Sequence, residues 1–262
     1  MRPNPAPRRL RHAVFDFDGT LSLLRAGWQA VMADMMVEAL AATPQAEAEP
    51  ALRERTAEPV LGMAGRPTLV QMAWLAEQVA ARGGTPRNPE AYKADYLARL
   101  AERVTYRADV EAGRRPAEHF RVPGALDFVA ALHRRGVACH IASGTDETAV
   151  REEAALLGFM PYITELRGAR ADGSDAKQVL IGRLVDEHGL AAGELAAVGD
   201  GRAEMLCARA VGGLAIGVAS DEAGWPGVDE YKRTLLIEAG ADVIIPNFNE
   251  PASLLAYLWP SE

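Results

Sequence analysis

Five short apolar runs stand out along the chain, and each is too brief to form a helix. They are His12–Phe15, Val137–Ala142, Leu195–Val198, Leu214–Val218 and Val243–Ile245. Runs of this length that are apolar on both faces are typical of strands buried within a parallel sheet.

Helical patterns separate the runs in the second half of the chain. Lys177–His188 has a helical pattern that stops at Gly189, and a further helix is expected after Pro251. Pro123 stands where a first helical residue would, and that helix is expected to end before Gly136. Strands and helices in alternation predict right-handed crossovers and a doubly wound, Rossmann-like α/β parallel sheet.

The long segment between the first two apolar runs has a helical pattern throughout. From Trp28 to Leu40 the apolar positions step by three and by one, which predicts an amphipathic helix with a methionine-rich stripe packed in a core. Further helices are expected at 68–82 and 89–107, and residues 43–58 are expected to form a loop with a short helix.

This helical segment is expected to be an insert in the sheet. An insert has to leave and rejoin at nearby points, so its linkers are expected at Leu21–Gly27 and Gly113–Arg121. The prediction is a chain in two parts. Residues 1–22 and 119–262 form the α/β core, and residues 23–118 form a helical domain.

Composition narrows the class of protein. Of the 262 residues, 49% are hydrophobic and 24% charged, as in an ordinary soluble globular protein, and the net charge is −8. That charge disfavours a nucleic-acid partner, and no apolar stretch approaches the roughly 20 residues that cross a membrane. The basic N-terminal segment leads into an apolar run too short for a signal peptide, and Cys139 and Cys207 form no CxxC pair. We therefore expect a cytoplasmic location, and nothing in the pattern predicts the oligomeric state.

Acidic residues follow two of the expected strands. Asp16 and Asp18 come directly after His12–Phe15, and Asp200 comes after Leu195–Val198. Ligands of open α/β sheets bind beyond the carboxyl ends of the strands, so these three carboxyl groups are expected to converge. The five histidines show no metal spacing, and oxygen donors alone suit Mg²⁺ better than zinc. We expect Asp16, Asp18 and Asp200 to bind Mg²⁺.

Phosphoryl transfer is the chemistry that such a site favours. A carboxylate beside the metal can attack phosphorus, and an acid two residues on can protonate the leaving oxygen and then activate water. The metal and a lysine would neutralise the phosphoryl group, and Lys177 is one of only three lysines against 25 arginines. Ser143 and Gly144 supply a hydroxyl and backbone N–H groups for phosphate binding.

These motifs resemble, in their order, those of the haloacid dehalogenase superfamily, in its branch of magnesium-dependent phosphatases. The motifs are Asp16-Phe17-Asp18-Gly19-Thr20, then Ser143, then Lys177, then Gly199-Asp200 with Glu204. The resemblance implies that Asp16 is the nucleophile and a metal ligand. It implies that Asp18 is the acid/base and offers its backbone carbonyl to the metal, and that Asp200 is the second metal carboxylate. It further implies that Ser143 binds phosphoryl oxygens, that Lys177 bridges Asp16 and the phosphate, and that the helical insert is a C1 cap.

The sequence also predicts the surroundings or roles of several residues beside the main catalytic set. Glu204 stands where an aspartate is usual, and its longer side chain can reach a metal-bound water or Lys177, so we place it outside the direct metal ligands. The segment Leu61–Arg66 resembles the cap loop that carries specificity residues in relatives, which makes Arg66 a candidate for substrate binding, together with Arg25. Asp221 and Glu222 are expected in a solvated loop.

The predicted function is Mg²⁺-dependent hydrolysis of a small phosphorylated metabolite, a sugar phosphate or a phosphoglycolate-like acid, through an aspartyl phosphate. Asp18 disfavours the dehalogenase branch of the superfamily, because that branch lacks an acid/base at this position. The phosphonate-hydrolysing branch needs a cap lysine, but Lys93, the only lysine of the insert, is expected on an exposed helix. Two alternatives stay open: a phosphosugar mutase that returns the phosphoryl group to its substrate, and a binding or regulatory protein that has lost turnover.

Overall fold

The computed structural model describes residues 10–103, 106–169, 176–222 and 227–259. Its strands are β1 (His12–Phe15), β2 (Ala138–Asp146), β3 (Ile163–Ala169), β4 (Leu195–Gly199), β5 (Leu214–Val218) and β6 (Val243–Ile245). They form one parallel sheet in the order β3-β2-β1-β4-β5-β6. The order steps outward from β1 in both directions, so the doubly wound α/β sheet predicted from the sequence is confirmed.

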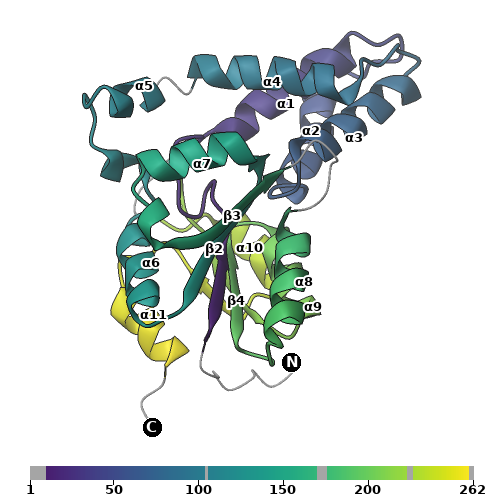
Figure 1. The fold of residues 1–262 in the computed structure, drawn as a ribbon. Coiled ribbons are helices and arrows are strands. Elements are labelled where there is room, and N and C mark those ends of the chain that lie inside the picture. Colours follow the sequence, from purple (N-terminus) through teal and green to yellow (C-terminus); the bar gives the residue numbers. More distant parts are fainter. Residues whose placement is uncertain (1–9, 104–105, 170–175, 223–226, 260–262) are drawn as a thin grey trace.

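Helices cover both faces of the sheet because successive strand residues point to opposite sides. Phe15 joins the apolar core on one face, and its neighbour Val14 joins the core on the other. The helices of the first layer are α6 (Ala125–Arg134), α7 (Glu147–Leu156) and α11 (Pro251–Leu258), and those of the second are α8 (Ala176–His188), α9 (Arg202–Ala210) and α10 (Glu230–Glu238). The strands are therefore enclosed between two helical layers (Figure 1).

A second group of helices lies beyond the carboxyl ends of the strands, at the end of the molecule opposite the two termini (Figure 1). Its members are α1 (Trp28–Ala41), α2 (Glu49–Gly62), α3 (Thr68–Ala81), α4 (Pro89–Arg103) and α5 (Tyr106–Glu111). The first four share an apolar core of their own, in which Met32, Met35 and Met36 are buried as the methionine stripe predicts. None of the helices in the described residues is long and apolar enough to span a membrane.

Two parts of the insert differ from the sequence expectation. Residues 43–58 are not mainly a loop, because α2 runs from Glu49 to Gly62. Alanine, glutamate and arginine favour helix there, and Pro50 lies in the first turn, where a proline costs no hydrogen bond. The single helix expected at 89–107 is divided into α4 and α5, with residues 104–105 outside the described part of the chain.

The chain enters and leaves the insert at adjacent points. The backbone N–H of Leu23 donates to the carbonyl of Phe120 at 2.8 Å, and the N–H of Val122 donates to the carbonyl of Leu21 at 3.0 Å. The expected linkers thus contact each other directly. The division into a core of residues 1–22 and 119–262 and an insert of residues 23–118 stays a prediction.

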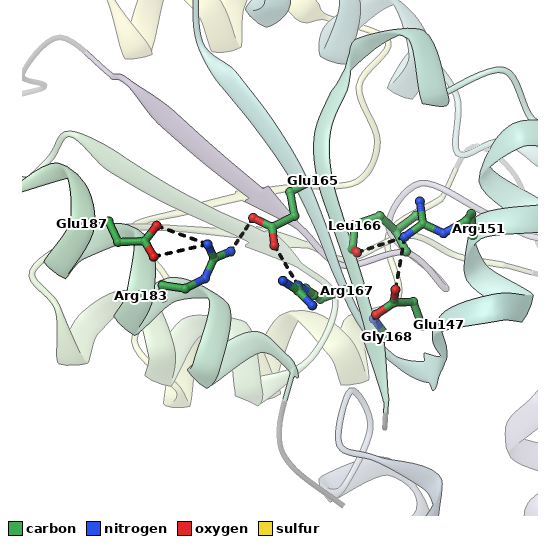
Figure 2. Close-up of polar contacts among 8 residues, drawn as sticks. All are labelled: Glu147, Arg151, Glu165, Leu166, Arg167, Gly168, Arg183 and Glu187. Carbon is green, nitrogen blue, oxygen red and sulfur yellow. Dashed lines mark hydrogen bonds and ion pairs between the residues drawn. The ribbon is translucent and has the colours of Figure 1, made fainter. Parts of the chain in front are cut away.

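The sheet contains one strand that the apolar pattern missed. Strand β3 lies at the edge, and polar residues alternate with apolar ones along it. Glu165 lies 2.7 Å from Arg167 of the same strand and also pairs with Arg183 of α8, while Arg151 of α7 donates to the carbonyl of Leu166 (Figure 2). Charged side chains around an edge strand discourage its pairing with another chain.

Two buried histidines on the sheet make stability depend on pH. His140 of β2 is 2% exposed, and its Nε2 lies 3.1 Å from Nδ1 of His12 on β1. Burial, and then the neighbouring His12, lowers the pKa of His140 to about 4. Between pH 4 and 6.5 the unfolded chain therefore binds more protons than the folded chain, so the free energy of unfolding falls as the pH is lowered through that window. The loss is at most about 3 kcal/mol.

Urea unfolding between pH 4.5 and 7 measures this dependence. His140→Leu is expected to flatten the profile, whereas replacement of the exposed His119 by leucine serves as a control and is expected to leave it unchanged. An unchanged slope in the His140 variant would show that other groups cause the acid sensitivity.

Candidate active site

A cavity of about 60 Å³ lies where the carboxyl ends of β1, β2 and β4 meet the inserted helices. Its core wall consists of Asp16, Asp18, Ser143, Gly144, Thr145 and Asp200. Its insert wall consists of Arg25, Trp28, Met32, Ala64, Gly65, Arg66, Thr68, Gln71 and Tyr96. The structure thus brings the predicted acids, the predicted phosphate-binding segment and both candidate arginines to one place.

The ammonium group of Lys177 is in contact with the carboxylate of Asp16. The first turn of α8 places the Lys177 side chain, 1% exposed, so that its Nζ is 3.1 Å from Oδ1 of Asp16. The same ammonium pairs with Glu204, in the first turn of α9, and donates to the backbone carbonyl of Gly65 at 2.8 Å. Glu204 therefore contacts the lysine, one of the two partners expected for it.

The ion pair with Lys177 stabilises the charged form of Asp16 only in part. Burial alone would lower the pKa of Lys177, but the charges of Asp16 and Glu204 raise it, so the ammonium stays charged. Burial raises the pKa of Asp16 well above its ordinary value, and Glu204, Asp200 and Asp18 raise it further, while Lys177 only partly offsets them. The group has more negative charge than one lysine balances.

Asp18 is held by residues from both parts of the chain. Its Oδ2 accepts a hydrogen bond from the Thr145 hydroxyl at 2.8 Å, and its Oδ1 lies 3.7 Å from Nε of Arg25. Burial raises the pKa of Asp18 to about 6, an effect that Arg25 opposes and Glu153 supports. This carboxyl group can therefore both give and take a proton near neutral pH.

Glu153 orients Arg25 and was not among the residues predicted from the sequence. The guanidinium of Arg25 donates to both carboxylate oxygens of Glu153, at 2.8 and 3.2 Å, and Glu153 is 3% exposed on α7. No spacing signal connects residues 25 and 153, so only the fold reveals this pair.

A second buried lysine, also missed, holds Asp200. Nζ of Lys232, on α10, lies 2.9 Å from Oδ2 of Asp200 and 2.7 Å from Oε1 of Glu222. Glu222 is thus paired and largely enclosed, so the expectation that it lies in a solvated loop is wrong. The ammonium of Lys232 holds Glu222 and Asp200 together, because a carboxylate that is buried needs a cationic partner.

The scarcity of lysine in the sequence could have indicated the contact between Lys232 and Asp200, because each of the few lysines is a candidate for a buried ion pair. Lys93 pairs with Asp146 at the end of β2, at 2.5 Å, and its side chain is only 19% exposed. The expectation that Lys93 lies on an exposed helix face is therefore wrong, because its ammonium reaches from α4 to the last residue of β2. In the described residues, all three lysines of the chain form ion pairs near the carboxyl edge of the sheet.

Ser143 and Gly144 lie at the cavity, within β2 rather than at the start of a helix. β2 continues through Asp146 with a register shift, and α7 begins only at Glu147. The Ser143 hydroxyl oxygen accepts a hydrogen bond from the Thr145 N–H at 3.1 Å. A Cβ on Gly144 would lie 2.5 Å from the Arg66 carbonyl oxygen, so the insert loop rests directly on this segment.

The turn after β1 depends on Gly19. Its φ of +76° favours glycine, and a Cβ there would lie 2.2 Å from Oδ2 of Asp200. The carboxylate of Asp200 is therefore packed against the turn that follows Asp18.

The donor set suits a hard divalent cation. Among the described residues, no three His, Cys, Asp or Glu side chains are grouped closely enough to hold a metal by themselves. The set implied by the resemblance needs only two side chains, Asp16 and Asp200, because Asp18 would contribute its backbone carbonyl. Both carboxyl groups line the cavity, Oδ1 of Asp18 is buried without a hydrogen bond, and the surplus negative charge favours a cation. Oxygen donors of this kind fit Mg²⁺.

The fold and the site together define an enzyme of the α/β class with an acidic pocket under a helical insert. The chain belongs to the haloacid dehalogenase-like hydrolase family, whose sequence model matches residues 10–212. No curated protein sequence matches the chain at a significant level.

Solved structures share the fold over almost the whole chain. A predicted phosphoglycolate phosphatase from Haemophilus somnus is 14% identical, with a TM-score of 0.59 over 95% of this chain and 99% of that one. A haloacid dehalogenase-like protein from Agrobacterium tumefaciens is 18% identical, with a TM-score of 0.60 over 94% and 98% of the two chains. A hydrolase from Pseudomonas syringae is also 18% identical, with a TM-score of 0.56 over 94% and 97%.

Proposed function

We propose that this hydrolase is a Mg²⁺-dependent phosphatase that acts on a small phosphorylated metabolite through an aspartyl phosphate. One observation carries the proposal. The buried carboxylate of Asp16 lies 3.1 Å from the ammonium of Lys177, on the wall of a cavity that Asp18, Ser143 and Asp200 also line. This arrangement supports Asp16 as the nucleophile, Asp18 as the proton donor and Lys177 as the cation beside the phosphoryl group.

Each residue has a part in the proposed reaction. Asp16 attacks phosphorus while the bond from phosphorus to the leaving oxygen breaks, and Asp18 gives its proton to that oxygen. Asp18 then takes a proton from water, which attacks the aspartyl phosphate and releases phosphate and free Asp16. Ser143 and the N–H of Gly144 bind the phosphoryl oxygens, and the charge of Lys177, which contacts Asp16, stabilises the phosphoryl group next to them. Mg²⁺, held by Asp16, Asp200 and the Asp18 carbonyl, would neutralise the charge of the phosphoryl group.

Metal removal tests this proposal. With Mg²⁺ present, the protein is expected to release free phosphate from para-nitrophenyl phosphate, and excess EDTA should reduce the rate by about 100-fold or more. Added MgCl₂ should restore the rate, which serves as the control for damage by the chelator. Full activity in EDTA would contradict the metal assignment.

The product distinguishes the phosphatase from the mutase alternative. A mutase returns the phosphoryl group to the sugar, so a hexose phosphate would give an isomer rather than free phosphate. Absence of any metal-dependent turnover would instead favour the binding or regulatory alternative.

A further inference from the structure

Gln71 is a polar side chain of the cavity that the proposed mechanism does not use. It projects from α3, is 3% exposed, and lines the cavity. Its Oε1 has no hydrogen-bond partner among the described residues. A buried acceptor without a partner is costly, so a ligand group that donates a hydrogen bond would stabilise it.

Four of the residues that line the insert wall together with Gln71 are uncharged. Met32 and Trp28 of α1 are apolar, and Thr68 contributes a hydroxyl at the start of α3. Tyr96 of α4 is 5% exposed, and burial raises the pKa of its phenol, so the group stays an uncharged hydroxyl. A leaving group in this part of the cavity meets an amide, hydroxyls and apolar surface.

Neither cation on the insert wall is both buried and free of a carboxylate partner. Arg25 is engaged by both oxygens of Glu153 and lies 3.7 Å from Asp18, so two carboxylates already face its single charge. The side chain of Arg66 is exposed to solvent. A carboxylate in the cavity would lose its hydration and lie near Asp18 and Asp200, whereas the buried cations beside these two acids already pair with carboxylates of the chain.

A hydroxyl fits Gln71 better than a carboxylate does. A hydroxyl both donates and accepts, so it satisfies either end of the amide, whereas a carboxylate only accepts and would leave Oε1 without a donor. The cavity is small, at about 60 Å³, and it also has to hold the phosphoryl group, which favours a short leaving group.

We propose that Gln71 binds a hydroxyl group of the leaving alcohol and that the substrate is a short polyol phosphate rather than a phosphoglycolate-like acid. This inference rests on the proposed phosphatase function. It narrows the substrate class of that site and makes Gln71 a specificity residue.

Three phosphate esters of equal carbon length test the inference. They are n-propyl phosphate, which carries no further polar group, glycerol 3-phosphate, which carries hydroxyls, and 3-phosphoglycerate, which carries a carboxylate. With Mg²⁺ present, kcat/KM for glycerol 3-phosphate is expected to exceed both others by about 10-fold or more.

Substitution of Gln71 then assigns the preference to this residue. Gln71→Leu is expected to lower kcat/KM for glycerol 3-phosphate by about 10- to 100-fold and to change that for n-propyl phosphate by no more than about twofold. Gln71→Met, closer in shape, gives a second measurement if the leucine variant folds poorly. Gln78→Leu, on the same helix but outside the cavity, is the matched control and should keep the preference.

The possible outcomes separate this inference from the proposed function. If n-propyl phosphate and 3-phosphoglycerate are hydrolysed as well as glycerol 3-phosphate, or if the Gln71 variants lose activity equally on all esters, the role of Gln71 is overturned and the phosphatase function stands. If none of these esters and no para-nitrophenyl phosphate is hydrolysed with Mg²⁺, both proposals fail.

Discussion

Asp16→Asn is expected to abolish turnover while the protein stays folded. The amide cannot attack phosphorus, and loss of a nucleophile typically costs several orders of magnitude, so we expect kcat for para-nitrophenyl phosphate to fall by about 10⁴-fold or more. The fold should survive because Lys177 keeps its ion pair with Glu204, and because removal of one charge relieves the repulsion that raises the pKa of Asp16. Steady-state kinetics and thermal unfolding measure the two effects.

A matched control separates the chemistry from the loss of charge. Asp186 is exposed on α8, and Asp186→Asn makes the same chemical change away from the cavity. This variant should keep wild-type kinetics. Substantial turnover by the Asp16 variant would rule out the nucleophile assignment.

Lys177→Met is expected to damage stability and activity together. Its removal leaves Asp16 and Glu204, 4% and 2% exposed, without the cation that both contact. Breaking a buried ion pair from one side costs about 3–5 kcal/mol in the free energy of unfolding. Turnover should fall by about 10³-fold, because the phosphoryl group also loses its ammonium partner. Urea unfolding and kinetics are the measurements.

A double variant distinguishes the two effects. Lys177→Met combined with Glu204→Leu removes one of the stranded carboxylates, so part of the stability should return while turnover stays low. Lys93→Met is the control lysine, since its pair with Asp146 is partly exposed and is worth at most about 1 kcal/mol. A Lys177 variant as stable as the wild type would contradict the buried-pair interpretation.

The distribution of lysine follows from the chemistry of the two cationic side chains. An ammonium is a compact charge that can be enclosed by several carboxylates, as Lys177 is by Asp16 and Glu204 and Lys232 is by Asp200 and Glu222. The guanidinium of Arg25 instead matches the two oxygens of Glu153 in a planar pair. In a chain that otherwise uses arginine, the positions of lysine therefore indicate where compact positive charge is needed.

Local patterns were sufficient for most elements of the fold. Strands such as Leu195–Gly199 are buried on both faces, so an unbroken apolar run marks them. Strand β3 was missed because Thr164, Glu165 and Arg167 interrupt its pattern, as is usual where one side of a strand is solvated. Helix α2 was underestimated because its helix-forming residues do not produce a clear apolar face.

The parallel sheet, the helices between β1 and β2 and the acids at the strand ends could all be predicted from the amino-acid sequence. Those features depend on residues that are close together in the chain. The spacing of such residues indicates which side of a strand or helix each one occupies. Three contacts became visible only in the folded protein: Glu153 orients Arg25, Lys232 pairs with Asp200, and Gln71 lines the cavity. These contacts join residues far apart in the chain, and they arise because parallel strands bring their carboxyl ends to one edge and the insert covers that edge. The spacing of residues along the sequence does not predict these contacts, because they depend on how separate helices and strands pack.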